Sequence, residues 1–106
     1  MPIEQELWAE RASTLSRVTE RFEAALNQYQ AFARQLPTID GNDTTLRATH
    51  DQLETVAAEA LWHLVIQREA LGLRSHADLM EIYAVPSNLR RKMGPRRSPT
   101  SLSSQV

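Results

Sequence analysis

The clearest apolar pattern lies in the first third of the chain. Large apolar side chains recur there every seven residues, at Trp8, Leu15, Phe22, Tyr29 and Leu36. Such a repeat puts them on one face of a helix, so the pattern predicts a helix from Pro2 to Leu36. That helix is about 50 Å long at 1.5 Å per residue, longer than a small core can cover. We therefore expect a homodimer, whose candidate interface is Trp8, Leu15, Phe22 and Tyr29.

A turn and a second helix follow. The segment "PTIDGND" is rich in turn-forming residues, and Asp43 or Asn42 can cap the next helix. The apolar positions predict that helix from Thr44 to Leu71, with Gly72 ending it. Its first half has one narrow apolar stripe, whereas "AEALWHLVI" is apolar on most sides, which is typical of a surrounded helix. We expect Trp62 to be buried there.

Two short helices are predicted to surround that apolar segment. Ser75 and Asp78 have the spacing of a capping box, which predicts a helix from His76 to Tyr83. The chain then turns at "AVP", and a last short helix is expected to follow. Trp62 should lie near these two helices.

The last short helix completes the expected fold. Ser87 or Val85 is expected to cap it, and it should end at Met93 before glycine and proline. The basic, serine-rich segment beyond has little apolar surface to bury and is predicted to be disordered. The sequence therefore predicts an all-α fold. A long two-helix hairpin and two short C-terminal helices form one domain, residues 1–94, followed by a disordered tail, residues 95–106.

Composition narrows the class of protein. Hydrophobic residues make up 42% and charged residues 24% of the 106 residues, which is ordinary for a globular domain. The apolar runs are too short to cross a bilayer, and the N-terminus lacks the basic and apolar segments of a secretory signal. We expect a cytoplasmic protein without a membrane partner. The absence of cysteine excludes disulfides.

Charge is unevenly distributed, although the net charge is only −1. Residues 1–60 contain ten acidic and five basic side chains, whereas residues 61–106 contain three acidic and seven basic ones. Any nucleic-acid contact would therefore be confined to the C-terminal end. The candidate contacts there are Asn88, Arg90, Arg91, Lys92, Arg96 and Arg97.

Two pairs of possible metal ligands occur at helical spacing. His50 and Glu54 are four residues apart, and so are Glu59 and His63, so each pair shares a helix face. Two ligands do not make a zinc site, and no third accompanies either pair. The sequence also contains no nucleophile elbow and no glycine-rich phosphate loop. We expect no metal, no cofactor, no catalytic residues and no enzymatic activity.

The segment "REALGLRSHADLMEIYAVP" resembles the first part of helix-turn-helix repressors of the phage-repressor type. The matching features are Arg68-Glu69, Gly72-Leu73, Leu79 within the short helix, and Val85 after the turn. The resemblance implies that the last short helix would enter the major groove of DNA. Two positions depart from the family: Met80 replaces a small residue, and Ala84 replaces glycine. The last helix is also short for reading base edges.

A second resemblance covers the whole layout. The segments "QREALGLR", "YAVP" and "RKMG" are similar to those of a family of small bacterial helical proteins of the domain-of-unknown-function kind. This resemblance implies an all-helical fold and a bacterial origin, and it implies no activity.

Two functions are therefore kept open. The first, which we favour, is a non-enzymatic interaction protein that forms homodimers. The alternative is a DNA-binding or nucleoid-associated protein that uses the basic C-terminal helix and tail. The position of the apolar row and of Asn88 in the folded chain distinguishes them.

Overall fold

The computed structural model describes residues 2–35 and 43–94, with side chains from residue 5 onward. Its helices are α1 (Pro2–Gln35), α2 (Thr44–Ala70), α3 (Ala77–Ile82) and α4 (Ser87–Lys92). Helices are the only regular secondary structure in these ranges, so the predicted all-α class is confirmed. The expected disordered tail, residues 95–106, lies outside the described residues, as do Leu36 and Asn42.

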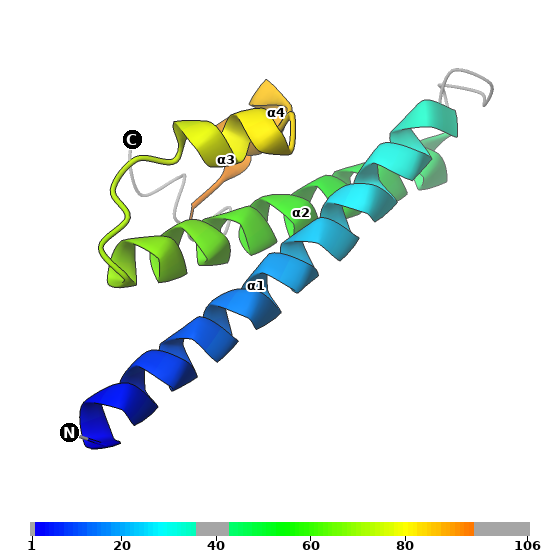
Figure 1. The fold of residues 1–106 in the computed structure, drawn as a ribbon. Helices are drawn as coiled ribbons and strands as arrows, with labels where there is room; N and C mark the ends of the chain where they lie inside the picture. The colour runs from blue at the N-terminus through cyan, green and yellow to red at the C-terminus, as the bar shows by residue number, and fades with distance from the viewer. Residues whose placement is uncertain (1, 36–42, 95–106) are drawn as a thin grey trace, which may run out of the picture.

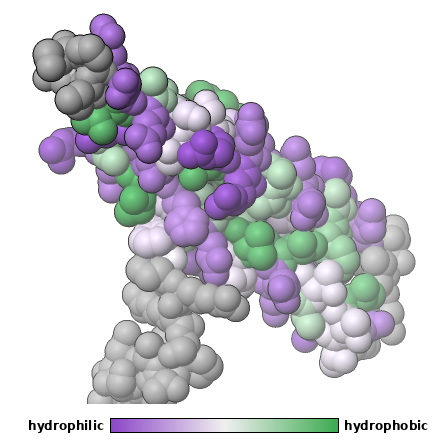
Figure 2. Space-filling model, turned by 90° about the horizontal axis from the view of Figure 1, so that it is seen from below, coloured by the Kyte–Doolittle hydropathy of each residue, from purple (hydrophilic) through white to green (hydrophobic). Residues whose placement is uncertain are grey.

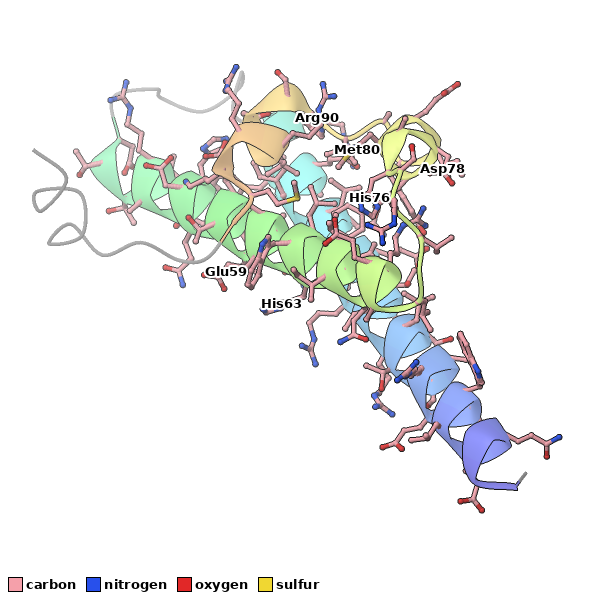
Figure 3. The ribbon with its side chains drawn as sticks, turned by 90° about the vertical axis from the view of Figure 1, so that its left-hand side faces the viewer. Glu59, His63, His76, Asp78, Met80 and Arg90 are labelled. Atoms are coloured by element: carbon pink, nitrogen blue, oxygen red, sulfur yellow. The ribbon has the colours of Figure 1, made fainter. Side chains whose placement is uncertain are left out.

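α1 and α2 pack together as the predicted long hairpin, and α3 and α4 lie together over one side of it (Figure 1). The N-terminal part of α1 continues past the end of α2 and leaves the rest of the molecule (Figures 1 and 3). All side chains of residues 5–13 are exposed. We call this segment the α1 arm.

Local signals in the sequence explain both ends of α2. The Asp43 carboxylate accepts hydrogen bonds from the backbone N–H groups of Thr45 (2.8 Å) and Leu46 (3.2 Å), so the predicted N-cap is confirmed. At the other end Gly72 has a φ of 92°, which glycine adopts without steric cost. The Leu73 N–H reaches back to the Arg68 carbonyl (3.0 Å), as in a Schellman motif.

The predicted caps of α3 and α4 are wrong. α3 begins after His76 without a side-chain cap, because Asp78 is paired with Arg68 instead of closing a capping box with Ser75. α4 begins after Pro86, also without a side-chain cap, so neither Ser87 nor Val85 has that role. The fixed φ of proline suits a helix start, which explains how α4 begins without such a bond.

α3 ends in a second Schellman motif. The Ala84 N–H bonds to the Glu81 carbonyl (3.1 Å) and the Val85 N–H to the Met80 carbonyl (2.9 Å). Ala84 has a φ of 47°, in the left-handed region that glycine favours. The turn therefore holds an alanine in a conformation that glycine adopts without steric cost.

The core lies where all four helices meet. Its buried side chains are Phe22, Ala25, Leu26 and Tyr29 of α1; Ala57, Ala58, Ala60, Leu61, Leu64 and Val65 of α2; Leu79 of α3; Val85; and Leu89 of α4. The prediction that Trp62 is buried there is wrong. Trp62 is only half-buried, with its ring beside that of His63 (centroids 5.4 Å apart), because its aliphatic neighbours take the core positions.

Large apolar side chains also remain on the surface. Leu7, Trp8, Val56, Ile66, Leu73 and Ile82 are the exposed ones. On the face shown in Figure 2, apolar side chains form small groups between polar ones. Within the described ranges, no helix combines the length and the apolar character needed to span a membrane.

Candidate interaction surfaces

A polar network fastens α4 to the hairpin. Asn88 of α4 donates from Nδ2 to the Tyr29 hydroxyl (2.6 Å) and to Glu54 Oε2 (2.5 Å). The Tyr29 hydroxyl also donates to Glu54 (3.3 Å). Lys92, one turn further along α4, donates to Glu54 Oε1 (3.0 Å). One carboxylate on α2 therefore binds side chains from both α1 and α4.

The electrostatics of Glu54 support this role. Burial by itself raises the pKa of the carboxyl group, but hydrogen bonds from Lys92 and Asn88 outweigh it, helped by the charges of Lys92 and His50. The pKa of Glu54 is therefore below its usual value of 4.5. The group is ionised at neutral pH, which strengthens the hydrogen bonds that it accepts.

The network already binds two of the candidate nucleic-acid contacts. Asn88, the candidate best suited to a base edge, faces the hairpin, and Lys92 is paired with Glu54. Arg90 and Arg91 are exposed on α4. Arg96 and Arg97 lie outside the described residues. The face of α4 that could meet DNA therefore keeps two arginines, which contact phosphate more readily than they specify a sequence without a partner such as Asn88.

A second polar cluster joins α3 to the end of α2. Arg68 donates from Nε to His76 Nδ1 (3.2 Å) and from Nη2 to Asp78 (3.2 Å) and to the Ser75 carbonyl (3.3 Å). Because His76 Nδ1 accepts, the ring proton is on Nε2, which lies 3.3 Å from Glu69 Oε2 and donates to it. His76 and Asp78 are both at the start of α3 (Figure 3). The cluster has a structural explanation and needs no ligand.

Tyr83 connects the end of α3 to α1. Its hydroxyl donates to Glu23 (2.6 Å), and its ring meets Phe22 edge to face, with centroids 5.3 Å apart. The hydrogen bond to Glu23, together with burial and the charge of Glu23, raises the pKa of Tyr83 above its usual 10.0. Met80 packs half-buried against the core nearby, so the side chain that departs from the helix-turn-helix pattern is accommodated.

The structure does not assemble the two candidate metal pairs into a metal site within the described residues. Glu54 belongs to the α4 network, and His50 Nδ1 lies 3.3 Å from Asp51. Glu59 and His63 project from α2 on the side away from α3 and α4 (Figure 3). In residues 2–35 and 43–94, no group of three or more acidic, histidine or cysteine side chains could hold a metal ion.

The structure divides the predicted dimer interface into two parts. Phe22 is fully buried and Tyr29 is 6% exposed within a single chain, so they serve the core and their predicted role as an open interface is corrected. Leu15 is half-buried against the core. Trp8 is 55% exposed on the α1 arm, and the Arg11 guanidinium lies 5.6 Å from its ring centroid.

A shallow groove lies at the other end of α1. Its volume is about 410 Å³, and it is lined by Tyr29, Gln30, Ala33, Arg34 and Pro86. Tyr29, Ala33 and Pro86 make much of the floor apolar. Arg34 lies in the last turn of α1 and is exposed. We call this feature the α1–α4 groove.

Comparison with protein-family models, with curated proteins and with solved structures finds no match to this chain. The two resemblances drawn from the sequence therefore stay predictions. Sequence reasoning missed the interhelical roles of Glu54, Glu23 and Arg68. A signal for the first was present, since Glu54 lies seven residues before the fully buried Leu61 and so shares its helix face.

Proposed function

We propose that the protein is a non-enzymatic interaction protein that forms homodimers through the α1 arm. One observation carries this proposal: a helical segment with exposed Leu7 and Trp8 extends beyond the end of α2. An unsupported helix of this length is marginal in water, because most helical stability comes from packing of its apolar face. Contact between the arm and a second copy of the chain would provide that packing.

The energetic argument depends on the two large side chains. Trp8 is 55% exposed and Leu7 is 47% exposed, so each still has about half of its surface to bury. Full burial of such a side chain stabilises by about 1.5–3 kcal/mol. Half of that gain from each of two side chains, repeated in both chains of a dimer, would give roughly 3–6 kcal/mol. That sum offsets a substantial part of the cost of association.

Light scattering at micromolar concentration tests the proposal. The expected mass is about twice the 12.0 kDa chain. The double variant Leu7→Gln/Trp8→Gln should shift the mass to that of one chain. Most of the helical circular dichroism signal should persist, because α2, α3 and α4 are unchanged. Ile82→Gln is the matched control, because Ile82 is exposed on α3 far from the arm, and it should remain a dimer. A dimer that the double variant leaves intact would refute the proposal.

The DNA-binding alternative receives less support from the geometry. Asn88 is the side chain suited to a bidentate contact with adenine, but it is bound to Glu54 and Tyr29. Of the described candidates, this leaves Arg90 and Arg91 exposed for contact with DNA. A binding selection from random duplexes at physiological salt distinguishes the two functions. Enrichment of one sequence that Arg90→Ala/Arg91→Ala loses would favour the alternative, while no enrichment would support an interaction protein.

A further inference from the structure

The α1 arm cannot fold back onto its own chain. It is part of one uninterrupted helix, so Trp8 stays about 32 Å along the axis from Tyr29 at 1.5 Å per residue. The α1–α4 groove beside Tyr29 is therefore out of reach of the arm in the same molecule. Any contact between the arm and this groove must join two copies of the chain.

The groove has the character of a site for an acidic, apolar segment. Its lining includes Tyr29, Ala33 and Pro86, and Arg34 belongs to its α1 side. Arg90 follows Pro86 by one turn, since the Arg90 N–H bonds to the Pro86 carbonyl (3.3 Å), so it stands above Pro86 on the α4 side. Both arginines are exposed, and neither belongs to the Glu54 network.

The arm has the complementary character. Leu7 and Trp8 are its large exposed apolar side chains. Glu6 and Glu10, one turn apart, are exposed beside them. Arg11, whose guanidinium lies against the Trp8 ring, is the one cation of residues 5–13, so two carboxylates outnumber it there. The arm thus combines apolar side chains that the groove floor can cover with carboxylates that Arg34 in the groove and Arg90 next to it attract. Opposite charges around an apolar contact direct which surfaces meet.

We propose that the α1 arm of one chain docks in the α1–α4 groove of a second copy, and that the second arm docks reciprocally in the first groove. Two such contacts are related by a two-fold axis and close a dimer without leaving a free arm. This inference depends on the proposed self-association and adds the surface that receives the arm. Leu7 and Trp8 meet the groove floor, while Glu6 and Glu10 lie near the partner's arginines.

A charge-swap experiment tests the docking. One variant reverses the arm, Glu6→Lys/Glu10→Lys, and a second reverses the groove, Arg34→Glu/Arg90→Glu. Each alone should raise the dissociation constant of the dimer by at least about tenfold, because like charges then face each other. An equimolar mixture should restore a mixed dimer, since each reversed arm meets a reversed groove. Circular dichroism checks that each variant is folded.

The control keeps the same two helices and the same change in charge. Arg21→Glu/Arg91→Glu reverses exposed arginines of α1 and α4. Neither lines the groove, and Arg91, unlike Arg90, is not one helical turn from Pro86, so this variant should leave the dimer intact. Sodium chloride at 1 M should weaken the unaltered dimer, because the screening length falls to about 3 Å.

The outcomes separate the two proposals. If Leu7→Gln/Trp8→Gln abolishes the dimer but Arg34→Glu/Arg90→Glu does not, self-association stands and docking in the groove is overturned. Failure of the mixture to restore association also overturns it. A mass that grows beyond two chains with concentration overturns the reciprocal arrangement. A single-chain mass for the unaltered protein overturns self-association and docking together.

Discussion

Replacing Ala84 by glycine is expected to stabilise the protein. Ala84 has a φ of 47°, and an L-residue in that region costs roughly 1–2 kcal/mol because its Cβ crowds the following carbonyl oxygen. Glycine removes this cost but makes the unfolded chain more flexible, which costs about 0.4–1 kcal/mol. The two hydrogen bonds of the turn involve only backbone atoms and are kept. The middle of both ranges gives a net stabilisation of about 0.8 kcal/mol.

Urea unfolding followed by circular dichroism, at one fixed protein concentration, measures this change. Ala24→Gly is the control, because Ala24 is exposed in the interior of α1 and glycine there should cost about 1 kcal/mol. Gly72→Ala is the converse, since Gly72 has a φ of 92° and an added Cβ meets no atom within 4 Å. It should destabilise through backbone strain alone. If Ala84→Gly destabilises as much as Ala24→Gly, the strain assigned to Ala84 is refuted.

Three further changes test the packing and the polar network. Leu89→Ala should lower the free energy of unfolding by about 2–5 kcal/mol because Leu89 is fully buried, whereas Ile82→Ala, at a 74% exposed position, should stay within about 0.5 kcal/mol in the same urea titration. The pKa of Glu54 is lowered on folding, so its contribution is present above pH 4.5 and is lost as the pH falls through the folded pKa. Glu54→Gln should therefore flatten the stability profile below pH 4.5, and an unchanged acid limb would contradict the network. The pKa of Tyr83 is raised, so its contribution is present below pH 10.0 and is lost as the pH rises through the folded pKa. Tyr83→Phe should therefore remove this loss of stability at alkaline pH, measured by the helical circular dichroism signal.

Local chemistry explains what could be predicted of the fold. Asp43 as cap and Gly72 as terminator are short-range signals, because each acts on backbone groups within five residues. The apolar periodicity likewise identified the face of α1 that contains Phe22 and Tyr29. The wrong caps of α3 show the limit of such signals. Asp78 has the right spacing for a capping box, but Arg68 competes for it from the end of α2.

The candidate sites were less predictable than the fold, and Asn88 illustrates the reason. Its position on α4 made it a candidate reader of DNA bases, and no neighbour in sequence indicates otherwise. Glu54, which binds it, is 34 residues away on another helix. The sequence shows that both residues are polar, but only the packing of α4 on α2 brings them together.

The apolar row of α1 shows most clearly which properties the sequence determines and which the tertiary structure determines. By itself the sequence determined that Trp8, Phe22 and Tyr29 share one helix face, because a period of seven residues is nearly two helical turns. It could not determine which of them that face buries within the chain. The tertiary structure decided this. Phe22 and Tyr29 pack in the core with side chains of α2, whereas α1 diverges from α2 toward the arm (Figure 1), so the same pattern gives a core at one end and an exposed tryptophan at the other. The physical reason is that periodicity depends on the geometry of one helix, whereas burial depends on how far its neighbours extend.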